Sequence, residues 1–105
     1  MHTDRLWGGT IVDLSLDVPN QEVTLAINVK HGNELRSHIL RFTGVSEFRF
    51  FNTIERPWDY AEVTEIHIKS QPSFEKLVYD IVLWSEDAGL SGVCSSATLD
   101  GLALI

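Results

Sequence analysis

The stretch from Glu34 to Asn52 constrains the fold most, because it holds the densest apolar and aromatic sequence in the chain. Its two short runs are separated by Thr43-Gly44. A helix over these residues would place Gly44 in its middle, beside two β-branched residues, and the glycine alone costs about 1 kcal/mol there. The stretch therefore predicts two core strands rather than a helix.

The aromatic side chains of these two runs are predicted to lie in the core. In an extended chain, alternate residues face opposite sides. The first run then places His38, Leu40 and Phe42 on one face and Leu35, Ser37, Ile39 and Arg41 on the other. Phe48 and Phe50 share a face in the second run, with Phe51 opposite. We expect Phe42, Phe48 and Phe50 to supply buried area rather than a ligand site, since large aromatics at alternating spacing usually do so.

The N-terminal part of the chain alternates clearly between apolar and polar residues. Val12, Leu14, Leu16 and Val18 face one way and Asp13, Ser15 and Asp17 the other, which is typical of a strand with one face in the core and one in water. After Pro19-Asn20 the same alternation places Val23, Leu25, Ile27 and Val29 on one face. A hairpin is predicted, with neighbouring strands antiparallel.

The C-terminal half predicts further strands and one alternative. Residues 62–70 alternate, with Thr64, Ile66 and Ile68 inward. Residues 77–85 suit a strand because Tyr, Ile, Val, Leu and Trp favour a pleated surface, although a single helix around 73–88 is the alternative. Residues 90–99 form a short strand. About seven or eight strands with frequent turns predict an all-β fold, an antiparallel β-sandwich or a flattened barrel, in one domain spanning residues 1–105.

Composition limits the classes of partner. The net charge of -7, with eight scattered Lys and Arg residues, argues against nucleic-acid binding. No apolar run approaches the roughly 18 residues that a membrane helix needs. The start of the chain does not resemble a signal peptide, and the lone Cys94 has no internal disulfide partner. We therefore expect a cytoplasmic protein that binds neither membrane nor nucleic acid.

Few catalytic or metal-binding patterns are present. The sequence has no glycine-rich phosphate loop and no nucleophile elbow, and it predicts no cofactor. Glu65 and His67 share a strand face, but a metal site needs a third and a fourth ligand, so we expect a solvated face and no metal. Cys94 is interpreted as a small buried hydrophobic residue.

The candidate binding site is the proline-bearing segment around Trp58 together with the acids that follow it. Aromatic anchors flanked by charges are typical of protein-binding patches. The site comprises Trp58, Asp59, Tyr60, Glu62 and Glu65. Residues 54–105 carry nine acids against three bases, which favours a basic partner. The competing interpretation is that Trp58 folds back to cap the core.

Two alternatives stay open. One is a small hydrolase-like or metal-dependent enzyme that uses the carboxylates between Asp59 and His67, namely Asp59, Glu62 and Glu65. The other concerns assembly: an apolar run at Leu102–Ile105, or an exposed strand edge, would support a homodimer.

The order of features also resembles a known class of proteins. It runs from a strand with Asp13, through Val23-x-Leu25, Leu40-x-Phe42-x-x-Val45 and Trp58, to Leu83-Trp84 and Cys94. This pattern is similar to small, mostly uncharacterised bacterial all-β proteins, some of which are thought to be immunity proteins that partner polymorphic toxins. The resemblance implies a β-sandwich and an immunity or inhibitor role, and it carries over no site residues.

Overall fold

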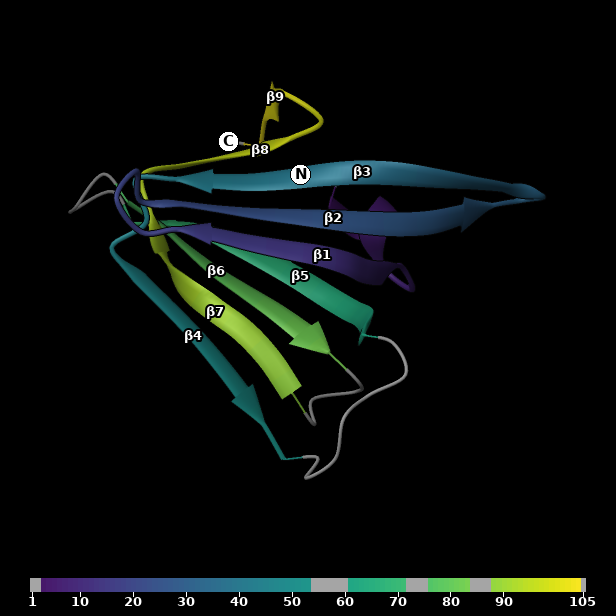
Figure 1. Cartoon of the computed structure of the whole chain (residues 1–105), viewed down its shortest axis with the longest axis horizontal. Coiled ribbons are helices and arrows are strands. Elements are labelled where there is room, and N and C mark those ends of the chain that lie inside the picture. The colour runs from purple at the N-terminus through teal and green to yellow at the C-terminus, as the bar shows by residue number, and fades with distance from the viewer. Residues whose placement is uncertain (1–2, 54–60, 72–75, 84–87, 105) are drawn as a thin grey trace.

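The computed structural model describes residues 3–53, 61–71, 76–83 and 88–104, which form one continuous antiparallel sheet of nine strands (Figure 1). A short 3₁₀ helix, η1 (Thr3–Leu6), precedes the sheet. The strands are β1 (Thr10–Asp17), β2 (Glu22–His31), β3 (Glu34–Thr43), β4 (Glu47–Asn52), β5 (Ala61–Gln71), β6 (Lys76–Leu83), β7 (Ala88–Cys94), β8 (Ser96–Leu99) and β9 (Leu102–Ala103). Their order in space is β4-β7-β6-β5-β1-β2-β3-β8-β9.

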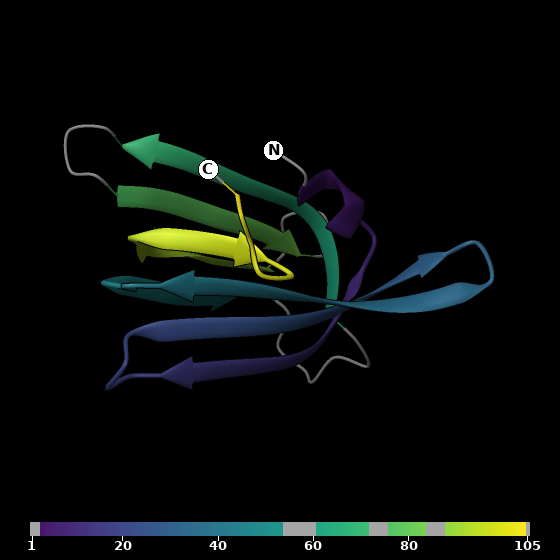
Figure 2. The same ribbon diagram turned by 90° about the horizontal axis from the view of Figure 1, so that it is seen from above.

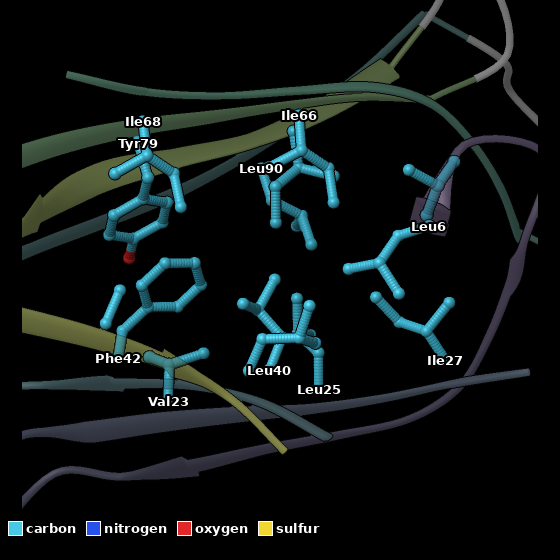
Figure 3. Close-up of a cluster of buried hydrophobic side chains, with 14 of the residues drawn as sticks. Leu6, Val23, Leu25, Ile27, Leu40, Phe42, Ile66, Ile68, Tyr79 and Leu90 are labelled. Carbon is cyan, nitrogen blue, oxygen red and sulfur yellow. The ribbon is translucent and has the colours of Figure 1, made fainter. Parts of the chain in front are cut away.

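The sheet folds over on itself, so that two halves face each other across the core (Figures 1 and 3). The upper half contains β1, β2, β3, β8 and β9, and the lower half contains β5, β6, β7 and β4. Within the described residues, β1 and β5 join the halves through two residue pairs, Thr10 with Glu62 and Ile11 with Ala61. The predicted all-β antiparallel fold is confirmed, and the sheet is not closed into a barrel.

Alternating side chains from the two halves fill the core (Figure 3). On β2 the fully buried residues are Val23, Leu25 and Ile27, as the alternation predicts. Phe42 of the upper half stacks on Tyr79 of the lower half, with ring centroids 4.0 Å apart and planes 11° from parallel. Each fully buried aliphatic or aromatic side chain of this kind stabilises the fold by about 1.5–3 kcal/mol.

Two chain crossings between the halves lie against each other at one end of the molecule. The chain passes from β3 to β4 through Gly44, and from β7 to β8 through Ser95. Ser95 N–H donates to the Thr43 carbonyl at 2.9 Å, and Ser46 N–H donates to the Val93 carbonyl at 2.9 Å. Gly44 has φ +63°, and a Cβ placed there would lie 2.7 Å from the Cβ of Ser95. The corner therefore requires glycine for both its conformation and its space.

Three details of the predicted strand arrangement are corrected. The two central runs do not pair with each other, because β3 pairs with β8 while β4 crosses to the lower half and pairs with β7. Residues 90–99 belong to two strands, since the crossing at Ser95 separates them. The alternative helix around 73–88 is excluded for Lys76–Leu83, which is β6, and its remaining residues lie outside the described ranges, apart from Ala88, which begins β7.

The predicted aromatic core is correct only in part. Phe42 is fully buried and Phe48 is half-buried, but Phe50 is 57% exposed because β4 is the last strand of the lower half. Leu35 and Ile39 are exposed as well, which is consistent with their position on the outer face of the upper half. The outer face of β3 in this stretch is therefore not covered by other described elements.

We predict that Gly44→Ala lowers the free energy of unfolding by about 2–3 kcal/mol, because a left-handed conformation costs a non-glycine residue about 1–2 kcal/mol and Ser95 must also move. The matched control is Gly32→Ala. Gly32 has φ +62° with nothing within 4 Å of an added Cβ, so that only the conformational cost of about 1–2 kcal/mol applies. Urea unfolding of both variants measures the difference, and equal losses would contradict the role given to the corner.

Candidate functional site

The predicted binding residues fall into two groups. Trp58, Asp59 and Tyr60 lie in residues 54–60, outside the described ranges. Glu62 and Glu65 lie on β5. Val63, Ile66 and Ile68 point into the core, and a register shift between Val63 and Glu65 keeps both glutamates on the opposite, outer face. The two described acids of the predicted site therefore face away from the space between the halves.

The Glu65 and His67 side chains are hydrogen-bonded on this outer face, with Glu65 Oε2 and His67 Nε2 2.8 Å apart. Both side chains are about half exposed, and a pair so open to solvent contributes about 0–1 kcal/mol. Asp80 of β6 is opposite His67 in the sheet. Among the described residues, no group of three or more His, Cys, Asp or Glu side chains could hold a metal ion. This part of β5 is a solvated strand face.

Cys94 is buried and has no disulfide partner. Burial raises the pKa of its thiol to about 11, and the nearby charge of Lys76 and a hydrogen bond from the Ser96 backbone offset only part of this effect. The side chain is therefore a neutral thiol near pH 7 rather than a nucleophilic thiolate. This matches its interpretation as a small core residue.

A second cluster of polar side chains, which the sequence analysis did not identify, lies where the β8–β9 hairpin meets β3. Asp100 and Gly101 form the two-residue turn of this hairpin, with φ +53° and +86°. Asp-Gly with two positive φ angles is typical of a type I′ turn. Asp100 N–H donates to the Ile39 carbonyl at 2.8 Å, and Ile39 N–H donates to the Asp100 carboxylate at 2.7 Å. The carboxylate thus continues the ladder of β3 beyond the end of β8.

The same carboxylate accepts a hydrogen bond from Nδ1 of His38, at 2.7 Å. His38 is buried, and its ring lies edge-on to that of His31 with centroids 5.8 Å apart. The Nε2 atoms of both rings are buried without a hydrogen-bond partner in the described part of the chain. Partial burial acts to raise the pKa of the Asp100 carboxyl, but the hydrogen bonds from His38 and Ile39, with the charges of His38 and Arg5, lower this pKa overall. The contacts fasten the hairpin to β3.

We predict that Asp100 makes the stability of the protein depend on pH. Because its folded-state pKa lies below the unfolded value of about 3.9, its contribution is complete above that value and is lost as the pH falls through the folded-state pKa. Asp100→Asn keeps the size of the side chain and tolerates the left-handed turn but carries no charge. Urea unfolding should show the difference between wild type and variant shrinking as the pH is lowered from about 6 to about 2.5. A difference that does not change with pH would contradict the role of the carboxylate.

The edge of β1 that faces away from β2 is a further surface feature of the described residues. On one side β1 pairs with β2 from Thr10 to Asp17. On the other side it pairs with β5 only at Thr10 and Ile11. The register with β2 shifts between Ile11 and Asp13. From Asp13 to Asp17 no described strand pairs with the second side, and Figure 2 shows β1 as the outermost strand of the upper half.

The apolar side chains of β1 are exposed. This β1 apolar stripe consists of Val12, Leu14, Leu16 and Val18, which are 55%, 40%, 47% and 70% exposed. Leu14 and Leu16 lie opposite the buried Leu25 and Val23 and therefore point to the core-facing side of the sheet. Both side chains are nevertheless exposed to solvent, because the pairing of β1 with β5 of the lower half ends at Ile11. The prediction that this face of β1 is covered by the core is wrong.

A shallow recess of about 160 Å³ extends the stripe toward β4. Its lining residues are Leu16, Val18, Gln21, Val45, Ser46, Glu47 and Phe48. A second recess of about 200 Å³ contains Glu47, Arg49, Val78, Ser91, Gly92 and Val93. Neither recess includes Glu62, Glu65 or His67. The sequence pattern identified the apolar residues of β1 but not their exposure.

Comparison with known proteins identifies a family. Residues 2–82 match the family of YxiG-like proteins, and because the match covers most of the chain, the protein belongs to that family. No curated protein matches the chain. The matched residues include the whole of β1, while Cys94 and Asp100 lie beyond them. Within the described residues, no helix is long and apolar enough to cross a membrane.

Proposed function

We propose that this member of the YxiG-like family is a non-enzymatic protein-binding module, and that it binds its partner at the free edge of β1. The observation that carries the proposal is the β1 apolar stripe, four apolar side chains exposed in succession beside a strand edge that no other described strand pairs with. Scattered exposed apolar residues are ordinary, but a contiguous set at a sheet edge is typical of a binding surface.

The surroundings of the stripe support this function. Protein interfaces combine an apolar centre with a polar rim. Leu14 and Leu16 form such a centre, and the recess that includes the half-buried Phe48 continues it. Asp13 and Asp17 on the other face of β1 supply charged neighbours. The partner expected from the composition, a basic protein, suits this arrangement.

The enzyme alternative, with the carboxylates between Asp59 and His67, has less support. Glu62 and Glu65 lie on an outer strand face, and Glu65 is already paired with His67. A catalytic site normally lies in a concave pocket where several functional groups meet. The binding role proposed from sequence for Trp58, Asp59 and Tyr60 stays a prediction, since these residues follow β4 in the undescribed segment 54–60.

An immunity or inhibitor protein is one specific kind of protein-binding module. It would require a toxin with a basic surface, because the protein has a net charge of -7.

Homodimerisation is a separate proposal about assembly. Leu102 of the short edge strand β9 is exposed, whereas the backbone N–H of Leu104 donates to the Ala97 carbonyl at 3.0 Å. Sedimentation of the full chain beside a form that ends at Gly101 tests this C-terminal contact.

We predict that the double variant Leu14→Ser, Leu16→Ser loses the partner while keeping the fold. Substitution of an exposed residue usually changes the free energy of unfolding by less than about 0.5 kcal/mol, and substitution of a partly exposed leucine changes it somewhat more. Removal of an interface anchor instead costs about 2 kcal/mol or more of binding free energy. The measurement is quantitative mass spectrometry of proteins retained from an extract of the native cells by each immobilised variant.

The matched control is Leu35→Ser. Leu35 is 68% exposed on the outer face of β3, away from the β1 apolar stripe. A protein retained by the wild type and by the control, but lost with the double variant, is the expected result. Equal retention by all three forms, or no retained protein, would contradict the proposed function.

A further inference from the structure

We propose that the free edge of β1 binds an extended segment of the partner protein as an added β-strand, and that this segment alternates apolar and basic residues. The inference rests on the protein-binding function proposed above and names the chemistry of the partner. It follows from three properties of β1: its unpaired backbone, the different character of its two faces, and the charge around it.

The backbone of β1 offers room for one more strand. Among the described strands, β2 is the only one that pairs with Asp13–Asp17. At about 3.3 Å per residue, these five residues present an edge about 16 Å long. Such an edge carries unpaired N–H and C=O groups that an extended peptide satisfies by main-chain hydrogen bonds.

The two faces of β1 determine which side chains suit the added strand. Directly opposed residues of neighbouring strands point to the same face. Residues of the partner opposite Leu14 and Leu16 therefore lie on the core-facing side, where apolar groups cover the exposed leucines. Residues opposite Asp13, Ser15 and Asp17 lie on the outer face. The partner segment should then alternate with a period of two residues.

The charge on the outer face favours basic residues at the alternate positions. Between Arg5 and Lys30 the chain contains no lysine or arginine, but it contains Asp13, Asp17 and Glu22. Asp17 is opposite Glu22 in the sheet, and Asp13 is opposite Ala26, so all three acids share the outer face. Arg41 lies on the same face but on β3, two strands away from the free edge. Lysine or arginine in an added strand would be next to carboxylates that form no ion pair with a basic side chain in the described part of the chain.

The same charges disfavour a second copy of the chain as the occupant. An antiparallel β1–β1 contact centred on Ser15 pairs all five residues of the free edge. It places Asp13 of each copy opposite Asp17 of the other, and like charges in opposed positions destabilise a sheet. Each copy also has a net charge of -7. The edge is thus protected against self-association while it stays open to a basic strand.

The test uses the full chain labelled with ¹⁵N and two synthetic peptides with blocked ends. One has the sequence Lys-Val-Lys-Leu-Lys-Val-Lys, and the other has glutamate in place of each lysine. Titration followed by NMR should show that the lysine peptide shifts the amide resonances of residues 13–17 and slows their hydrogen exchange. The glutamate peptide should bind weaker by about tenfold or more, since several cross-strand charge pairs change sign.

Variants locate the charge effect. Asp13→Asn should weaken binding of the lysine peptide by about two- to fivefold, as expected for one cross-strand charge pair. The control Asp80→Asn removes one negative charge from the outer face of β6, and it should change the affinity by less than about twofold. Equal effects of the two variants would show a general attraction between net charges and would overturn the proposed site.

Several other outcomes overturn the inference. These are equal affinity for the two peptides, resonance shifts that avoid residues 13–17, no binding of the lysine peptide, and a wild-type dimer in sedimentation that Leu14→Ser converts to a monomer. The proposed function is judged separately. If the native partner is lost with the Leu14 and Leu16 variants while the lysine peptide does not bind, the protein-binding function stands and the basic strand is wrong.

Discussion

The short contact between β1 and β5 is the constraint on which the rest of the structure depends. Gly8 N–H donates to the Val63 carbonyl at 2.6 Å, Val63 N–H donates to the Gly9 carbonyl at 2.8 Å, and two residue pairs follow. This contact keeps the nine strands in one sheet, yet it ends at Ile11. Beyond Ile11, β1 pairs with β2 alone among the described strands. The sheet can therefore fold into two facing halves, and one edge of β1 has no described partner.

Packing at the opposite end holds the halves together. The stacked rings of Phe42 and Tyr79 join them across the core, and Gly92 leaves room for the Tyr79 ring, since a Cβ there would lie 2.7 Å from Cζ. The paired crossings at Gly44 and Ser95 fasten the same end. Buried contacts therefore account for the stability of the fold, whereas the exposed leucines of β1 contribute little to it. This division leaves the edge available for binding.

Much of the fold could be predicted from the sequence, because period-two alternation is a local property. It identified β1, β2, β5 and β6, the buried face of β2, and Ile66 and Ile68 as buried side chains of β5, but it placed Thr64 inward where the register shift buries Val63. Pairing partners are not local, which is why the separation of β3 from β4 was missed. Alternation also assigned Leu14 and Leu16 to the correct face but could not show that nothing covers it. The contact between His38 and Asp100 joins residues far apart in the chain, although the Asp100-Gly101 turn signal was present in the sequence.

Amide hydrogen exchange of the unbound protein shows whether one edge of β1 is free. In a strand paired on one side only, alternate amides point to solvent. We expect alternate amides of Asp13–Asp17 to exchange rapidly, whereas successive amides of Val23–Ile27 in β2, which is paired on both sides, should all be protected. Uniform protection along β1, equal to that of β2, would contradict the account.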